Sequence, residues 1–271
     1  MDGQQLIYTV AGRLEAPPLI LLHGFVSHRG VWRQTLALCR QQHCCVAVDL
    51  LGFGNSDKPI DADYTPLAQA RRVLQLADAL GFERFALAGH SMGGQIVLVI
   101  AALLAPERVT RLLTVASVVT GQLTPVVRHI AYPQIVSGAI FPGLYALWRQ
   151  WVHHPWYGAA MFQHWFHRLD AVPFQQWAVD REMALQPGIH EPAYQAAEGI
   201  RRLDMTPHLE KITAPTLAIV GQQDRIVPVT DSLAIARHVP DSRLVVFDEC
   251  GHFPMYEQPE RYLEAVRSWV T

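Results

Sequence analysis

The chain has 271 residues, of which 50% are hydrophobic and 17% are charged, and its formal net charge is −2 at pH 7. This length allows a large buried core, and the small negative charge gives no electrostatic basis for nucleic-acid binding. The first residues lack the basic region and apolar run of a secretory signal, and the spacing of the four cysteines matches no zinc or disulfide framework. We therefore expect a cytoplasmic protein with reduced thiols that needs no metal or cofactor.

Residues 130–148 carry no charged side chain, which raises the question of a membrane span. Prolines and glycines interrupt this stretch, and no flanking apolar run extends it to the length that a bilayer requires. The interrupting residues are Pro133, Gly138, Pro142 and Gly143. We therefore predict no membrane span.

Predicted strands and helices alternate through the first 116 residues. Apolar runs that predict strands occupy residues 6–10, 19–22, 44–48, 85–88 and 109–116. Helices are predicted over 31–39 and over 65–80, where Thr65 can cap the first turn, Pro66 suits its first position and Gly81 can end it. Strands that are apolar on both faces and alternate with helices indicate a mostly parallel, doubly wound α/β sheet.

The pattern changes at about Gly121, and the sequence to about residue 203 contains helical segments without a convincing strand. Strands resume at 216–220 and 243–247, and a helix over 259–270 closes the chain. We therefore predict an α/β core made of residues 1–120 and 206–271, with an all-helical cap inserted at residues 121–205.

The segment from Phe85 to Ala102 carries the clearest functional signal. It places the sequence Gly89-His90-Ser91-Met92-Gly93 between an apolar strand and an apolar helix. Glycines allow the tight strand-to-helix turn that lifts a serine hydroxyl above the sheet and directs the first helical amides towards it. In this context the pattern predicts that Ser91 is a nucleophile. With this motif the chain resembles the α/β-hydrolase family, and the resemblance covers nearly all of the chain outside the predicted cap.

A serine nucleophile needs a base, and the base needs a carboxylate that orients it. The family resemblance implies that the acid and then the histidine follow the serine along the chain. Asp224 follows the predicted strand 216–220, and His252 follows the strand 243–247. Reacting groups collect at the carboxyl ends of parallel strands. We therefore predict that Ser91, Asp224 and His252 form a catalytic triad.

Two other positions for the acid can be weighed against Asp224. Some relatives of this family carry the acid after the strand that follows the nucleophile helix, but no Asp or Glu occurs between Glu107 and Asp170. Asp248 and Glu249 are too near His252 along the chain to reach its outer nitrogen easily. Asp224 is therefore the preferred acid.

The tetrahedral intermediate needs hydrogen-bond donors for its oxyanion. We expect one donor to be the backbone N–H of Met92, directly after the nucleophile. The family resemblance implies that the other is the N–H of Phe25, in the loop His23-Gly24-Phe25, although this loop lacks the longer glycine run of some relatives. The glycine-punctuated loop at residues 49–56 also resembles the family, and we expect it to be structural.

The serine distinguishes this chain from the dehalogenases and epoxide hydrolases of the same family, which use an Asp nucleophile. We predict a serine hydrolase that cleaves a small or medium apolar carboxylic ester through an acyl-enzyme. One alternative is a C–C bond hydrolase of ring-cleavage (dienone) products, a group that often carries Asn before the serine and Trp after the histidine. Here those positions hold His90 and Phe253. Another alternative is a ligand receptor that has kept the triad.

Aromatic residues are concentrated in the predicted cap, and some are expected to line an apolar substrate pocket. The candidates for the pocket wall are Phe141, Trp148, Trp151, Trp165 and Phe253. The charges between residues 108 and 168 are all positive, which suggests a substrate with an anionic or polar group. His164 and His167 have helical i, i+3 spacing, but no nearby carboxylate completes a metal site, so we predict none. The sequence does not indicate the oligomeric state.

Overall fold

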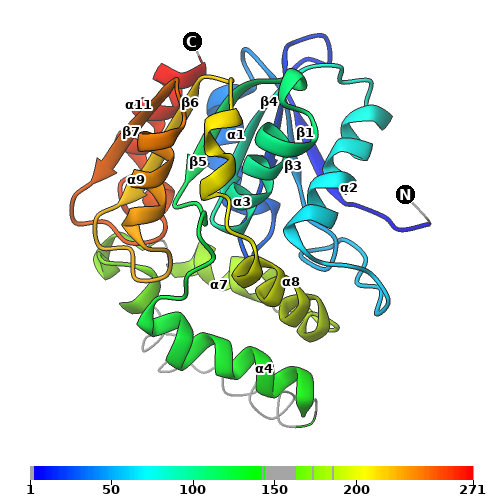
Figure 1. Cartoon of the computed structure of the whole chain (residues 1–271), viewed down its shortest axis with the longest axis vertical. Helices are drawn as coiled ribbons and strands as arrows, with labels where there is room; N and C mark the ends of the chain where they lie inside the picture. Colours follow the sequence, from blue (N-terminus) through cyan, green and yellow to red (C-terminus); the bar gives the residue numbers. More distant parts are fainter. Residues whose placement is uncertain (1–2, 142, 144–162, 173, 185, 271) are drawn as a thin grey trace.

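The computed structural model describes residues 3–141, 143, 163–172, 174–184 and 186–270 (Figure 1). Within these residues, seven strands form one sheet in the order β1-β3-β2-β4-β5-β6-β7. All neighbouring strands pair in parallel except β1, which runs antiparallel to β3 at the edge of the sheet. The strands are Tyr8–Ala11 (β1), Pro18–Leu22 (β2), Cys44–Val48 (β3), Phe85–His90 (β4), Val109–Val115 (β5), Thr216–Gly221 (β6) and Ser242–Phe247 (β7).

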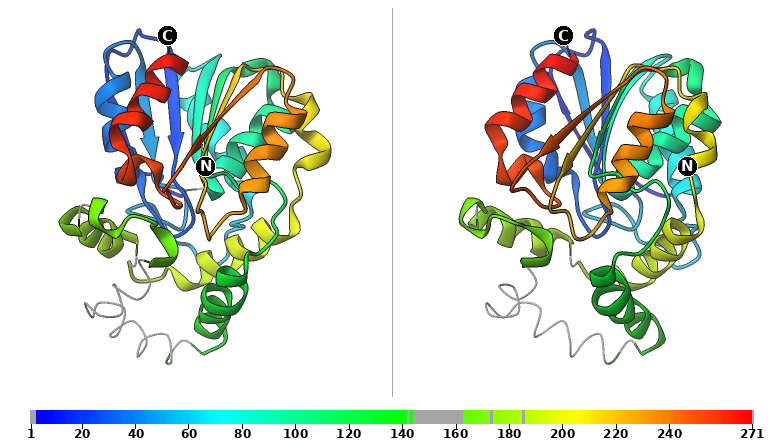
Figure 2. Two further views of the ribbon diagram at one scale, coloured as in Figure 1. Left: turned by 90° about the vertical axis from the view of Figure 1, so that its left-hand side faces the viewer. Right: turned by 60° about the vertical axis from the view of Figure 1, so that its left-hand side comes forward.

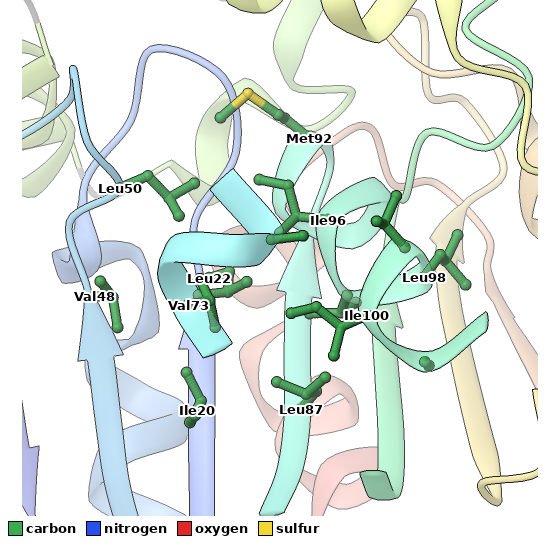
Figure 3. Packing of buried hydrophobic residues seen from close by; sticks show 14 of the residues in the cluster. Ile20, Leu22, Val48, Leu50, Val73, Leu87, Met92, Ile96, Leu98 and Ile100 are labelled. Carbon is green, nitrogen blue, oxygen red and sulfur yellow. The ribbon is translucent and has the colours of Figure 1, made fainter. Parts of the chain in front are cut away.

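One face of the sheet is covered by α2 (Pro66–Ala79), α3 (Met92–Val99) and α9 (Val229–His238) (Figure 1). Buried side chains of these helices and of the strands form one apolar cluster, in which Ile20 of β2 and its register partner Leu87 of β4 lie on neighbouring strands (Figure 3). Every residue of α3 is buried, and all of them except Gln95 are apolar or glycine. The helix that follows Ser91 is therefore held firmly in the core.

The other face is covered by α1 (Arg33–Cys39) and α11 (Pro259–Val270). Tyr262 and Trp269 of α11 are buried against this face, together with Leu19 and other strand residues that point away from α3. The central strands are therefore buried on both faces, which explains their continuous apolar runs.

Between β5 and β6, the described residues form helices and no strand. The longer ones are α4 (Tyr132–Ile140), α7 (Phe174–Ala184) and α8 (His190–Arg202), and they lie at the end of the sheet where the parallel strands terminate (Figure 2). The helices observed in this part of the chain agree with the predicted helical insertion. The boundaries of the insertion at residues 121 and 205 remain a prediction. No helix among the described residues has the length and apolar character needed to cross a bilayer.

The two ends of this insertion lie side by side at its base. The N–H of Met205 donates to the carbonyl of Val119 at 2.9 Å. The buried carboxylate of Asp231, in the first turn of α9, accepts the N–H of Val119 at 2.7 Å. The side-chain amide of Gln95 in α3 donates to the carbonyl of Leu203 at 2.9 Å. The two ends of the insertion are therefore bonded to each other and to the core at its base.

The predicted elements match the observed ones with shifts of a few residues. The predicted helix over 31–39 is divided into a 3₁₀ turn, Arg29–Trp32, and α1. The first strand is displaced to Tyr8–Ala11, and β4 extends two residues beyond its predicted end to His90. Pattern reasoning missed α9 and the short helix α10 (Pro254–Glu257), which both lie just after the loops that carry predicted site residues.

Candidate active site

Ser91 lies at the turn between β4 and α3 and has a backbone φ of 53° and ψ of −115°. Non-glycine residues rarely adopt a positive φ, so surrounding contacts must hold this conformation. The N–H of Ser91 donates to the carbonyl of Val115 at 2.9 Å, and its carbonyl accepts the N–H groups of Gln95 and Val118, each at 3.2 Å. These bonds fix the strained turn at the carboxyl end of the sheet.

Two glycines make this turn sterically feasible. A Cβ at Gly89 would lie 2.3 Å from the carbonyl oxygen of Gly93, and a Cβ at Gly93 would lie 2.2 Å from the carbonyl oxygen of Leu22. Neither position can accept a side chain without displacement of the backbone. The glycines of the motif therefore serve close packing between β4, α3 and β2.

His252 and Asp224 form a buried pair in the loops after β7 and β6. His252 Nδ1 donates to Asp224 Oδ2 at 2.7 Å, and their side chains are 2% and 0% exposed. The second oxygen of Asp224 accepts the backbone N–H groups of Ile226 at 2.8 Å and Val227 at 3.0 Å. Both oxygens of the carboxylate therefore accept hydrogen bonds. The imidazole is held in the tautomer that leaves Nε2 free to accept a proton.

The pairing of β6 with β7 explains why these two residues meet. Gly221 pairs with Phe247 at the ends of the two strands, and the following loops are joined by further bonds. The N–H of Gln223 donates to the carbonyl of Cys250 at 2.9 Å, and the N–H of Cys250 donates to the side-chain oxygen of Gln223 at the same distance. Asp224 and His252 follow immediately along these tied loops.

His90 is a further histidine at this site, and the sequence suggested no role for it. Its ring is buried and lies 4.8 Å from the ring of His252, centroid to centroid. Its Nε2 donates to the backbone carbonyl of His252 at 3.0 Å. Burial lowers the pKa of His90 well below the ordinary value for histidine, so His90 is a neutral donor that supports the His252 loop.

His23 shapes the loop that carries Phe25. The N–H of Leu50 donates to His23 Nε2 at 3.0 Å, and His23 Nδ1 donates to the carbonyl of Gly24 at 2.7 Å. Burial lowers the pKa of His23 to about 4, so its ring is neutral and structural. Phe25 and Met92 both line the cavity that contains Ser91, and their role as oxyanion donors remains a prediction.

The loop at residues 49–56 is held by the buried carboxylate of Asp49. This carboxylate accepts the backbone N–H groups of Arg29 at 2.6 Å and Asn55 at 2.9 Å and also contacts the Arg29 guanidinium. The Ser56 hydroxyl donates to the carbonyl of Asp49 at 2.6 Å. These internal bonds agree with the structural role that was expected for the loop.

A cavity of about 290 Å³ opens at the carboxyl end of the sheet, and both Ser91 and His252 line it. Among the predicted wall residues, Trp165 and Phe253 line this cavity. The prediction for Phe141 is wrong, because its side chain is 56% exposed at the end of α4 and does not line the cavity. Trp148 and Trp151 lie outside the described residues.

The arginines that suggested an anionic substrate do not line this cavity where they are described. Arg108 pairs with Asp78, Arg111 donates to the carbonyl of Trp269, and Arg168 pairs with Asp170. Arg128 is exposed, and Arg149 lies outside the described residues. Arg181 of α7, which the sequence did not single out, is the described arginine that lines the cavity. Within the described ranges, no three His, Cys, Asp or Glu side chains are grouped as a metal site would require.

Asp180 of α7 joins the helical insertion to the core, and pattern reasoning missed it. Its carboxylate accepts hydrogen bonds from His28 Nε2 at 2.8 Å, from the Arg33 guanidinium at 2.5 Å and from the Tyr256 hydroxyl at 2.5 Å. Burial alone would raise the pKa of Asp180, but these hydrogen bonds outweigh it and lower the pKa to about 2. No local pattern indicates this cluster, because its partners are dispersed along the chain.

Comparison with known proteins places this geometry in a family. A family model described as alpha/beta hydrolase fold matches residues 17–259. The 2-hydroxymuconate semialdehyde hydrolase of Pseudomonas sp. (strain CF600) is 29% identical over 273 residues, which cover 93% of this chain and 86% of that protein. The pimeloyl-[acyl-carrier protein] methyl ester esterase of Nitrosomonas europaea is 29% identical over 257 residues, which cover 91% of this chain and 93% of that protein.

Solved structures agree with this placement. The structure of a thermophilic esterase from Thermogutta terrifontis superimposes with a TM-score of 0.78 at 26% sequence identity, covering 98% of this chain and 93% of that chain. The similarity therefore extends over the sheet and the inserted helices together. The family model, these relatives and the arrangement of the strands lead to one conclusion: the chain belongs to the alpha/beta hydrolase fold family and is a hydrolase of that fold.

Proposed function

We propose that this protein is a serine hydrolase that cleaves a small or medium apolar carboxylic ester through an acyl-enzyme. The observation that carries the proposal is the buried His252–Asp224 pair, bonded at 2.7 Å, in which His252 lines the same cavity as Ser91. A histidine oriented by a buried carboxylate, on the same cavity as a serine at a strained turn, supplies the groups that acyl transfer requires.

In the proposed reaction, Ser91 Oγ attacks the ester carbonyl while His252 Nε2 accepts the hydroxyl proton. Asp224 stabilises the resulting imidazolium, and the backbone N–H groups of Phe25 and Met92 donate to the oxyanion. Collapse of the intermediate breaks the bond to the leaving alcohol, which takes the proton from His252 and leaves an acyl-Ser91. Water then attacks the acyl group with His252 as base, and the carboxylic acid is released.

The size and lining of the cavity support a mostly apolar substrate of modest size. Its volume of about 290 Å³ is at the small end of the range for ligand sites, about 300–1,000 Å³. The two carboxylates at its wall, Asp180 and Asp231, are already bonded to protein donors. Most of the remaining wall is apolar. The esterases among the relatives agree with this reading.

A second candidate is hydrolysis of a C–C bond in a ring-cleavage product, and a specific observation favours it. Two of the similar proteins, 29% and 27% identical to this chain, are named 2-hydroxymuconate semialdehyde hydrolases. The same three catalytic groups would serve either reaction. His90 and Phe253, which differ from the residues that often flank the triad in C–C hydrolases, make the ester the preferred substrate.

A panel of p-nitrophenyl esters of increasing acyl length tests the proposal, with Ser91→Ala as the inactive control. We expect rapid multiple turnover that is greatest for short or medium chains and is lost in the control. A fluorophosphonate adduct, located by mass spectrometry, should lie on Ser91. Feeble ester turnover together with rapid loss of the chromophore of a dienone ring-cleavage product would replace the ester by the C–C substrate. Tight ligand binding with a single slow turnover would instead indicate a receptor.

A further inference from the structure

Glu257 is a buried acid near the site that the proposed mechanism does not use. It ends the short helix α10, and it is 2% exposed. Its Oε1 accepts the backbone N–H of Gly251 at 2.8 Å, and its Oε2 accepts the backbone N–H groups of His167 and Arg168, also at 2.8 Å each. Charge-assisted bonds of this kind are stronger than neutral ones and fix the position of the groups that make them.

The two segments that Glu257 joins belong to different parts of the molecule. Gly251 directly precedes His252 in the loop after β7, whereas His167 and Arg168 belong to the helical insertion. A further bond connects the same two segments, because the N–H of His252 donates to the carbonyl of Trp165 at 2.8 Å. Trp165 lines the cavity, so this part of the insertion is in reach of a substrate.

The two segments approach closely enough to exclude a side chain between them. A Cβ at Gly251 would lie 2.8 Å from the carbonyl oxygen of Trp165 and 2.9 Å from the backbone nitrogen of His167. Segment 165–168 and the loop 250–252 therefore form one bonded unit, because the Glu257 carboxylate accepts hydrogen bonds from both of them. Displacement of either segment would remove bonds from the other.

A carboxylate suits this place because each of its two oxygens accepts hydrogen bonds. An amide has one accepting oxygen and one donating nitrogen, so it could satisfy either Gly251 or the pair His167 and Arg168, but not both. The unsatisfied side would carry a buried N–H without a partner, which favours separation of the two segments. The backbone N–H of His252 is bonded to Trp165 of segment 165–168, so the position of His252 would change when the two segments separate.

We propose that Glu257 is a positioning residue for His252. It couples the position of segment 165–168 at the cavity to the alignment of the general base. The inference rests on the proposed function, because His252 has an alignment to lose only if it acts as the base. A misplacement of a reacting group by about 1 Å can lower a rate by about 100-fold. The coupling allows contact between a substrate and Trp165 to favour the productive position of the imidazole.

The test compares Glu257→Gln with Glu260→Gln in the full chain. The Glu260→Gln substitution makes the same change of charge three residues further along the chain, at an exposed position in the first turn of α11. We expect kcat for a p-nitrophenyl ester and the rate of fluorophosphonate labelling at Ser91 to fall by about 10- to 100-fold in Glu257→Gln. We expect KM to change less than threefold, and Glu260→Gln to match the wild type. Rates are expressed per active site and measured well below the melting temperature, so loss of folded protein does not contribute.

A second variant keeps the test decisive if Glu257→Gln fails to fold. Gly251→Ala retains the carboxylate but inserts a Cβ between the two segments, and we expect it to lower kcat and labelling in the same way. A folded Glu257→Gln protein with kcat and labelling within twofold of the wild type would overturn the inference. If Glu257→Gln does not fold, wild-type rates in Gly251→Ala would overturn it. Failure of the wild type itself to turn over the ester or to be labelled at Ser91 would instead refute the proposed function.

Discussion

Replacement of Asp224 by Asn tests the assignment of the acid. The carboxylate accepts three N–H groups, from His252 Nδ1 and from the backbone of Ile226 and Val227. In Asp224→Asn the one accepting oxygen of the amide is required by the two backbone donors, so its NH₂ group faces His252. The imidazole must then present an unprotonated Nδ1 to this group and carry its proton on Nε2, where it cannot accept one from Ser91.

The size of the effect follows from the cost of restoring the productive tautomer. The amide would have to rotate and leave two partly buried backbone N–H groups unpaired, at about 1 to 3 kcal/mol each. A total of about 2 to 6 kcal/mol corresponds to a loss of about 30- to 10⁴-fold in kcat, since about 1.4 kcal/mol is tenfold in rate. The fold should be kept, because the oxygen still accepts both backbone donors.

Asp248→Asn is the matched control, because Asp248 is the exposed carboxylate that lies four residues before His252 in the sequence. Steady-state ester hydrolysis is measured for both variants, with circular dichroism to show that each is folded. We expect Asp248→Asn to retain wild-type kcat. Loss of activity in Asp248→Asn together with retention in Asp224→Asn would refute the assignment and the reasoning about the tautomer.

Three further predictions concern stability and can be checked by chemical unfolding. Because the pKa of Asp180 is lowered to about 2 from 3.8, its ionised form contributes about 2.5 kcal/mol above pH 4. This stability is lost as the pH falls from 4 to 2, so Asp180→Asn should be less stable than the wild type at pH 7 by about that amount and equal to it near pH 2. Gly93→Ala should lower the free energy of unfolding by more than 2 kcal/mol and abolish ester turnover, because the added Cβ meets backbone atoms. Gly81 has a positive φ but nothing within 4 Å of the added Cβ, so Gly81→Ala should lower the free energy of unfolding by about 1 kcal/mol and stay active. The pKa of His23 is lowered to about 4, so its neutral form stabilises the folded protein above pH 6.5. Up to about 3 kcal/mol of this contribution is lost as the pH falls from 6.5 to 4, because the unfolded chain binds the proton first. A His23 ring that titrates near pH 6.5 by NMR would contradict this prediction.

The sheet could be predicted from the sequence, and the three candidate catalytic side chains could be selected, because each leaves a local signal. Strands buried on both faces give continuous apolar runs, and a strained turn after a strand demands glycines near Ser91. Asp224 and His252 were predicted because each follows such a run by a few residues. Their convergence then follows from parallel pairing, since neighbouring parallel strands end at the same edge of the sheet.

Other features of the site leave no comparable local signal. Helical periodicity in an aromatic-rich insertion does not reveal which rings face the cavity, so Trp165 and the exposed Phe141 were equally good candidates. Asp180 depends on partners as far apart in sequence as His28 and Tyr256. Glu257 binds backbone N–H groups, which every non-proline residue offers, so no pattern of side chains marks its partners.

The paired ends of the helical insertion give the molecule a modular construction. The chain leaves the sheet near Val119 and returns near Met205, and one hydrogen bond joins these two points. A different set of helices grafted between them would leave the strand order intact, but it would also have to replace the bonds that Trp165, His167 and Arg168 make with the His252 loop and Glu257. A graft that joins only the two ends should therefore keep the sheet and lose the support of the His252 loop.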